Sequence, residues 1–194
     1  DLLDRIDSGT SPVCEDREAS EEEWGVLKLG AISSGVFLAD GQTKALRVGT
    51  TPRLEHEVKA GDVLLSRKNT PELVGASAYV RRTRSRVLLP DLIFRLVLRQ
   101  DTAVLPEYLQ AMLSAPYTRA RLRQIAGGSA SSMSNISKAR LLGISVPVAS
   151  ENDQGLLVGS LQRIDLLIDA VTNRQRSLAS LSVSLRARAF RSDL

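Results

Sequence analysis

The sequence has almost no cysteine and almost no histidine. Cys14 is its single cysteine and His56 its single histidine among 194 residues. A disulfide within the chain is therefore excluded, and a structural zinc site is close to excluded because it takes about four Cys or His ligands. Such low cysteine usage is typical of a reducing compartment, so we expect a cytoplasmic protein.

Long apolar runs are also missing. No run approaches the ~20 residues that a transmembrane helix needs, so we expect no membrane span. The chain begins at Asp1 instead of a methionine, and no signal-like apolar stretch follows. We therefore expect a fragment of a longer protein, or a chain that lacks its native start.

Motifs that carry catalysis are absent as well. There is no Gly-x-Gly-x-x-Gly motif, no Gly-x-x-x-x-Gly-Lys-Ser/Thr motif and no Asn/Asp-Pro-Pro-Tyr/Phe motif of amino-methyltransferases. His56 stands between Glu55 and Glu57, which suggests a general base, but a solvated surface histidine is the stronger interpretation. Cys14 as a nucleophile would need His56 as its base. We expect no catalytic residue, no metal and no cofactor.

Positive charge is in excess. The formal net charge is +4 and the sequence pI is about 9.6, and arginine far outnumbers lysine. A basic balance favours a nucleic-acid partner. An arginine-rich genome composition would produce the same bias, and composition leaves both explanations open.

The end of the chain, residues 154–190, has the pattern of one long helix. No proline falls within it, and no glycine follows Gly159. Apolar residues recur at alternating steps of three and four, as in a coiled coil, and Gln175 and Ser182 share their register. A helix of this length would reach about 50 Å. The apolar positions on this register, called the seam below, are Leu157, Leu161, Ile164, Ile168, Val171, Leu178, Leu185 and Ala189.

A stripe of this length has to be covered by other apolar groups. It packs either on the chain's own globular part or, in the interpretation we prefer, on a partner helix. Gln175 and Ser182 on the seam would then help to fix its register.

The preceding residues predict an α+β unit. Short strands are expected at residues 24–30, 35–37, 45–48, 63–66, 74–80, 87–89, 92–98 and 144–147, with turns at Gly and Asp residues between them. Pro106 and Pro116 begin two expected helices that end at Ser114 and Ile125, and Ser137 caps a third over residues 138–142. We thus expect an irregular, mostly antiparallel β unit with short helices over residues 1–150, then a long coiled-coil helix over residues 151–194.

The order of these motifs resembles one family, the specificity subunits of type I restriction-modification systems. The resemblance rests on the sequence Gly-Asp-Val-Leu-Leu from Gly61, on Pro-Glu-Tyr-Leu from Pro106, on Gly-Gly-Ser from Gly127, on Asn-Ile-Ser from Asn135 and on Gln154 before the helix. It covers the chain from about Gly9 to Phe190, and it depends on the ordered set, because no single motif is specific. Two features depart from the family. Only Gln154 remains of the usual Pro-Pro-Leu-x-Glu-Gln, and the chain carries one recognition unit and one helix where full-length members carry two.

The resemblance implies a non-catalytic DNA target recognition domain that directs a DNA adenine methyltransferase, and in some systems a restriction nuclease, to its site. Two long helices would pair antiparallel and space two recognition domains. The chain would be half of a longer subunit, a half-sized subunit that dimerises, or the recognition end of a single-chain methyltransferase. A coiled-coil adaptor whose globular part binds protein is the alternative from a different class.

Three groups of side chains are candidates for DNA contact. Arginines suit phosphates and guanine edges, and Asn pairs with adenine. The first group is Arg81, Arg82, Arg84 and Arg86, three of which would share one face of a strand. The second is Arg67, Lys68 and Asn69, and the third comprises Ser129, Ser131, Ser132 and Asn135 in a small-residue loop. Each group has a solvated loop as its plain alternative, and we expect the acidic run at residues 15–23 to be solvated too.

Overall fold

A computed structural model describes residues 2–127 and 133–190. The chain divides into two compact units, Asp1–Ala149 and Ser150–Leu194. Each unit is described by itself below, as unit 1 and unit 2.

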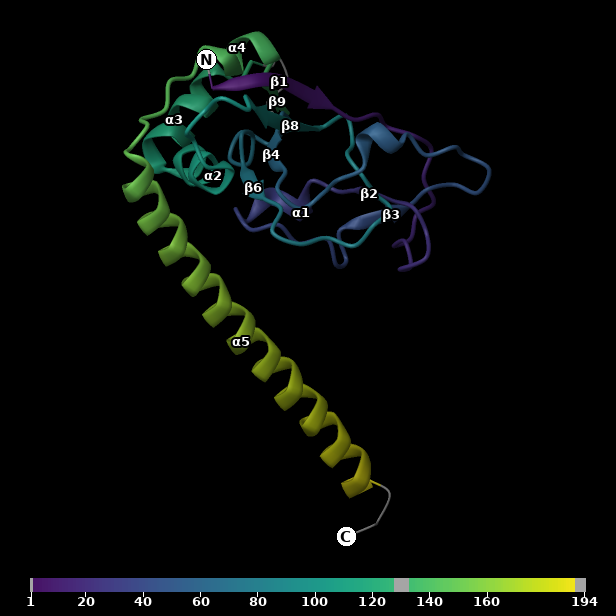
Figure 1. The fold of residues 1–194 in the computed structure, drawn as a ribbon. Helices are drawn as coiled ribbons and strands as arrows, with labels where there is room; N and C mark the ends of the chain where they lie inside the picture. The colour runs from purple at the N-terminus through teal and green to yellow at the C-terminus, as the bar shows by residue number, and fades with distance from the viewer. Residues whose placement is uncertain (1, 128–132, 191–194) are drawn as a thin grey trace. The chain divides into compact units, whose positions relative to one another are not determined.

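A four-stranded antiparallel sheet forms the centre of unit 1 (Figure 1). Its strands are β1 (Leu3–Ser8), β8 (Ile93–Leu98), β4 (Val63–Ser66) and β6 (Ser77–Tyr79), in that order. Every residue of β4 is buried because the strand is flanked on both sides, with Leu64 opposite both Arg95 and Ala78. The continuous apolar sequence of β4 is therefore explained by its place as a fully buried central strand.

Two smaller sheets complete the β structure. In one, β2 (Gly25–Leu27) lies between β3 (Thr43–Ala45) and β7 (Val87–Leu88), antiparallel to β3 and parallel to β7. In the other, β5 (Lys68–Asn69) pairs antiparallel with β9 (Ser134–Asn135). Both join segments that are far apart in the sequence.

Short helices connect and cover these sheets. They are α1 (Gly30–Ser33), the 3-10 turn η1 (Leu54–His56), α2 (Pro106–Ser114), α3 (Pro116–Ile125) and α4 (Lys138–Leu142). Proline begins α2 and α3, where its missing N–H costs nothing. The hydroxyl of Ser137 caps α4 by accepting from the backbone N–H of Arg140 at 3.2 Å. These three helices, and the α+β class, are as the sequence predicts.

The core of unit 1 joins the two larger sheets. Ile32 of α1 is fully buried among side chains of both sheets. The other fully or nearly fully buried members of this cluster are Leu27, Ala31, Val58, Leu64, Ala78, Val80, Val87, Leu89 and Ile93. One apolar core therefore holds sheets that share no backbone ladder.

Two predicted strands are wrong. Residues 35–37 follow α1 as a turn, in which Gly35 has φ +86° and the backbone N–H of Leu38 donates to Ala31 at 2.9 Å. Residues 144–147 have no strand partner, because the backbone N–H of Ile144 donates to Leu141 as the chain leaves α4. The strands predicted at residues 24–30 and 74–80 are shorter than expected.

Unit 2 is dominated by one continuous helix, α5 (Glu151–Phe190), of 40 residues. It begins at Glu151, the start given for the coiled-coil helix and three residues before the apolar pattern that opens at Gln154. The hydroxyl of Ser150 accepts from the backbone N–H of Asp153 at 3.2 Å, which satisfies one of the free N–H groups at the helix start. The long helix predicted from the sequence is thus present.

We predict that Gly75→Ala destabilises unit 1 more than Gly35→Ala. Both glycines have positive φ, 74° and 86°, so each alanine carries a similar backbone strain of about 1 kcal/mol. A Cβ at Gly75 would lie 2.9 Å from Nη1 of Arg119 and 3.0 Å from Cβ of Leu122, whereas a Cβ at Gly35 meets nothing within 4 Å. We expect an extra loss of about 1–2 kcal/mol for Gly75→Ala in urea denaturation. Equal losses would show that the contact with α3 is not tight.

Candidate nucleic-acid interface

The second predicted group meets Asn135 of the third in the structure. Lys68 lies opposite Asn135, and Asn69 opposite Ser134, in the β5–β9 ribbon. Nε of Arg67 points to Oδ1 of Asn135 at 3.4 Å, and its guanidinium lies 5.2 Å from the ring centroid of Phe94. Residues separated by more than sixty positions thus form one polar surface strip, in which Lys68 is exposed.

Asn69 has a different place from the one predicted. Its side chain is buried, its Nδ2 donates to the hydroxyl of Ser66 at 3.2 Å, and its Oδ1 accepts from the backbone N–H of Thr70 at 2.9 Å. Reading an adenine would require both bonds to be broken. The amide of Asn69 orders the turn after β4, and we leave it out of the contact surface proposed below.

The small-residue loop is anchored beside the ribbon. The backbone groups of Gly127 and Asn135 exchange two hydrogen bonds, at 2.9 and 2.7 Å. Ser129, Ser131 and Ser132 lie outside the described residues. Asn135 is half-buried and is the described member of this predicted group.

The arginines at residues 81–86 do not share the one face of a strand that the sequence predicts for three of them. The guanidinium of Arg84 donates to the backbone carbonyls of Glu23 at 2.9 Å and Ser85 at 3.1 Å, and lies 3.4 Å from that of Glu21. Its Nη2 is buried and has no hydrogen-bond partner among the described residues. This side chain therefore acts as an internal support for the loop at residues 20–23.

The neighbouring arginines also contact the protein itself. Arg86 donates to the backbone carbonyl of Glu22, and its own backbone N–H donates to the carboxylate of Glu57 at 2.8 Å. Arg81 forms an ion pair with Glu107 and lies 5.7 Å from the ring centroid of Tyr79. Arg82 is exposed. These contacts spread the guanidinium groups of Arg81, Arg84 and Arg86 over separate partners.

The acidic run beside them is ordered by an ion pair. Arg17 donates to both carboxylate oxygens of Glu23, at 2.6 and 2.7 Å, and to Glu15 at 2.8 Å. The hydrogen bond from Arg17 lowers the pKa of Glu23 to about 2. The run is on the surface, as predicted, but it is a folded segment that the arginines at residues 84 and 86 hold in place.

Asp62, the acidic residue of the Gly-Asp turn before β4, pairs with Arg95 of β8. Its Oδ2 lies 3.0 Å from Nε of Arg95 and accepts from the backbone N–H of Lys59 at 2.9 Å. Burial raises the pKa of Asp62 in spite of the arginine. This motif therefore positions the turn and the sheet, and its carboxylate is largely buried.

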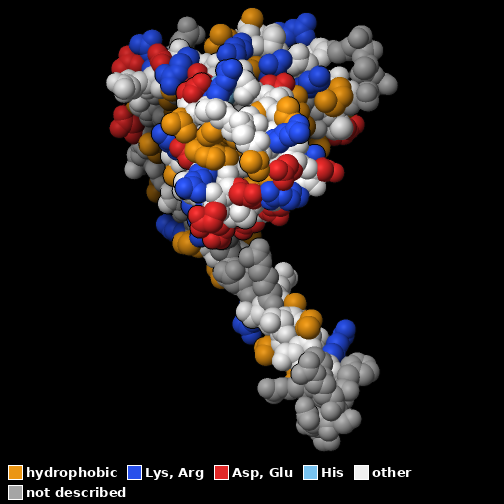
Figure 2. Space-filling model, turned by 90° about the vertical axis from the view of Figure 1, so that its right-hand side faces the viewer, with side chains coloured by type: hydrophobic (Ala, Val, Ile, Leu, Met, Phe, Trp, Pro, Cys, Tyr) orange, Lys and Arg blue, Asp and Glu red, His pale blue; other side chains and the backbone are white. Residues whose placement is uncertain are grey.

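Figure 2 shows one face of the described residues. On this face the basic and acidic side chains of unit 1 are interspersed, and they form no uniform basic patch. Among the described residues, no group of His, Cys, Asp and Glu is arranged to hold a metal ion. None of the described helices combines the length and apolar character needed to cross a membrane.

The seam of α5 is largely exposed. Ile164 and Ile168 are each 52% exposed, and Leu185 is 64% exposed. Val171 and Leu178 are exposed as well, whereas Leu157 and Leu161 are half-buried. This exposure is what a helix that pairs with a second helix would show as a single copy.

Comparison with known proteins relates this chain to one group. No family model matches the sequence. The specificity subunit of the type I restriction enzyme EcoEI from Escherichia coli is 27% identical over 186 residues, which is 95% of this chain and 31% of that protein. The crystal structure of the S subunit of a type I restriction-modification system from M. genitalium matches the fold with a TM-score of 0.57 at 14% identity, over 89% of this chain and 39% of that one.

The resemblance to type I specificity subunits is confirmed. It holds in sequence with the E. coli protein and in fold with the M. genitalium protein. The chain spans about a third of the length of these specificity subunits.

We predict that Arg84→Met weakens folding and leaves DNA affinity nearly unchanged. The variant keeps the aliphatic stem but removes the donors to the carbonyls of Glu21, Glu23 and Ser85, which we expect to cost about 1–3 kcal/mol in urea denaturation. Arg5→Met is the control, because Arg5 is 60% exposed and its loss should cost less than about 0.5 kcal/mol. Normal stability with a large loss of DNA affinity would restore Arg84 to the DNA contacts that the sequence suggested.

Proposed function

We propose that this chain is a DNA sequence-recognition module that directs a DNA adenine methyltransferase to its target site. The observation that carries the proposal is the combination of one α+β unit and one 40-residue helix in a chain that is similar to a type I specificity subunit over 95% of its length. The proposed partners are duplex DNA, a methyltransferase subunit and, in systems that restrict DNA, a restriction subunit, all in the cytoplasm.

DNA would contact unit 1 at the β5–β9 ribbon. Lys68 is exposed there and can neutralise a phosphate, and Arg67 and Asn135 offer a guanidinium and an amide beside it. Phosphate contacts supply affinity, and contacts to base edges supply sequence choice. Ser129, Ser131 and Ser132 belong to the predicted contact set, and the Gly127–Asn135 bonds anchor the ends of their loop at the ribbon.

The chain itself would carry out no chemistry. The role of unit 1 is to bind DNA and to present it to the methyltransferase, so the residues 1–150 act as a target recognition domain. This assignment needs no cofactor or metal in the chain, and it agrees with the absence of catalytic motifs from the sequence.

The role of α5 would be to set a distance. Its seam, including Ile164, Ile168 and Val171, would pack antiparallel on a second such helix, from the other half of a longer subunit or from a second copy of this chain. A helix rises by about 1.5 Å per residue, so a rigid pair converts helix length into the spacing between two recognition domains.

The second candidate is a coiled-coil adaptor whose unit 1 binds protein. It draws support from the arginines at residues 81–86, because their side chains are engaged within the chain. A related possibility keeps DNA recognition but places the chain at the end of a single-chain methyltransferase. Binding to duplex DNA that falls steeply with salt separates the first proposal from the adaptor.

We predict that this chain directs methylation of a gapped DNA site. The parent gene would be expressed with its neighbouring methyltransferase gene in a host that lacks methylation, and N6-methyladenine would be mapped by sequencing. A palindromic site means two copies of one recognition domain, an asymmetric site means half of a two-domain subunit, and a short ungapped site means a single-chain enzyme. No methylation, from a methyltransferase that is active with another specificity subunit, would favour the adaptor.

We predict that Ile168→Asp separates α5 from its partner helix. A carboxylate on the seam would be buried without a counter-charge in the paired state, at a cost of several kcal/mol. Sedimentation should show dissociation into single chains. Ala170→Asp is the matched control, since it adds the same charge to an exposed position on the outer face of the helix. Unchanged association of Ile168→Asp would overturn the pairing proposal.

A further inference from the structure

Two arginines of unit 1 differ from the rest in having no partner within the described part of the unit. Across residues 2–127 and 133–149, the guanidinium groups of Arg47 and Arg53 make no hydrogen bond or ion pair with another described residue. Both side chains are exposed. Arginines that already donate to carbonyls must break those bonds before they bind a ligand, whereas these two are available as they stand.

The two arginines lie at either end of one loop, residues 47–53, between β3 and η1. The backbone N–H of Thr50 donates to Arg47 at 3.0 Å, and Gly49 has φ +86°, so the loop turns tightly. The backbone N–H of Arg47 donates to Val13 at 3.1 Å, and Leu46 is bridged to Cys14. These bonds fix the loop against the segment at residues 10–14.

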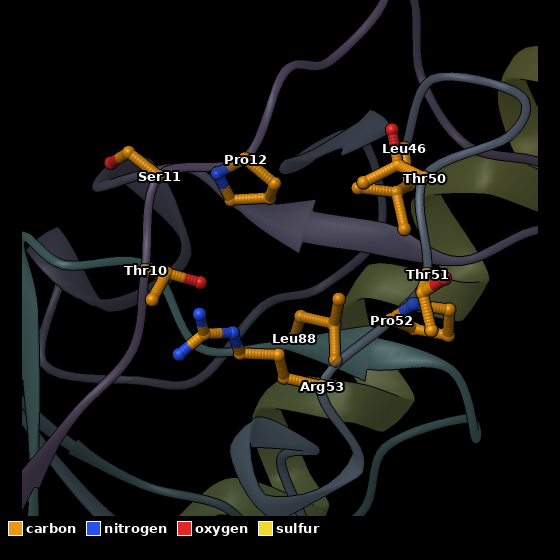
Figure 3. Close-up of a pocket in the computed structure, with 9 residues that line it drawn as sticks. All are labelled: Thr10, Ser11, Pro12, Leu46, Thr50, Thr51, Pro52, Arg53 and Leu88. Atoms are coloured by element: carbon orange, nitrogen blue, oxygen red, sulfur yellow. The ribbon is translucent and has the colours of Figure 1, made fainter.

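A pocket of about 280 Å³ lies between the loop and that segment. Figure 3 shows the hydroxyl of Thr10 turned toward the guanidinium of Arg53, with Thr50 and Thr51 at the other end. Leu88 lies between the two ends, while Pro12 lies beside Ser11 and Leu46 beside Thr50. The hydroxyl of Ser11 is engaged with the carboxylate of Asp91 and so is not free to bind a ligand.

We propose that this pocket and loop form a contact site for the DNA phosphate backbone. The site rests on the proposed function and extends it to residues outside the β5–β9 ribbon. The guanidinium of Arg53 and the hydroxyl of Thr10 bind one phosphate, Arg47 binds a neighbouring phosphate, and Thr51 donates a further hydrogen bond. The deoxyribose packs on the apolar side chains of Pro12, Leu46 and Leu88.

The chemistry of the site favours a nucleotide chain over a free anion. A phosphate needs a cation and a hydroxyl donor, which Arg53 and Thr10 supply at one end of the pocket, and Thr51 offers a further hydroxyl at the other end. The apolar side chains of the pocket offer no hydrogen bond to an inorganic anion, but they can pack on the apolar face of a sugar. Because backbone bonds hold both walls, little ordering is needed on binding.

The test measures the affinity of the full 194-residue chain for a mixed-sequence DNA duplex at several salt concentrations. The variants are Arg53→Gln, Arg47→Gln and Thr51→Val, with Arg5→Gln as a charge-matched control that is exposed and paired with Asp4. Each of Arg53→Gln and Arg47→Gln should reduce the slope of log K against log salt by about 0.9, which is one released counterion. Thr51→Val should lower affinity about fivefold with the slope unchanged, and Arg5→Gln should leave the slope as it is.

The outcomes separate this inference from the proposed function. If the wild-type chain binds duplex but Arg53→Gln and Arg47→Gln behave like Arg5→Gln, the pocket is overturned while DNA recognition stands. If the wild-type chain does not bind duplex at any salt concentration, both are overturned. A second experiment titrates the chain with inorganic phosphate at constant ionic strength. If phosphate saturates the pocket without any effect on duplex binding, the pocket is a site for a free anion and the inference is overturned. Equal thermal stability of wild type and variants confirms that each folds.

Discussion

The fold of unit 1 depends on arginine side chains that donate to backbone carbonyl groups of irregular loops. Short strands and long connections leave many carbonyls without a ladder partner, and a buried carbonyl without a donor is unfavourable. Arg84 donates to residues 23 and 85, Arg95 to Glu57, Arg119 to Val74, Arg123 to Glu72 and Arg140 to Ile125. A guanidinium carries five N–H donors in a rigid fork, so one side chain can hold several loops.

This use of arginine changes how the positive charge of the chain should be understood. The net charge of +4 indicates a nucleic-acid partner only if the cations are free to meet phosphates. In the densest arginine cluster, at residues 81–86, Arg81, Arg84 and Arg86 are held by carbonyls and carboxylates. Arg47 and Arg53 are spaced apart on a loop and have no such partners among the described residues. Clustering in the sequence and availability in the structure are therefore separate properties, and the second governs binding.

The helix α5 is subject to a different constraint. A single helix of 40 residues, about 60 Å long, cannot cover a continuous apolar seam with its own side chains. Positions such as Ile168 and Leu178 remain more than half exposed, and burying them on a second helix would be favourable for each apolar group. The exposed seam that makes an isolated helix unfavourable is also what the proposed pairing with a second helix would use.

The sequence by itself determined the elements whose signals are local. The seam of α5, the prolines that begin α2 and α3, the Ser137 cap and the buried strand β4 follow from periodicity and capping, and the ordered motifs indicated the family. Tertiary structure alone decided that Asn69 is buried, that β5 pairs with β9 and that Arg84 supports a loop while Arg53 is exposed. Those outcomes depend on which distant carbonyl or strand edge lies within reach of a side chain, and a linear pattern carries no such information.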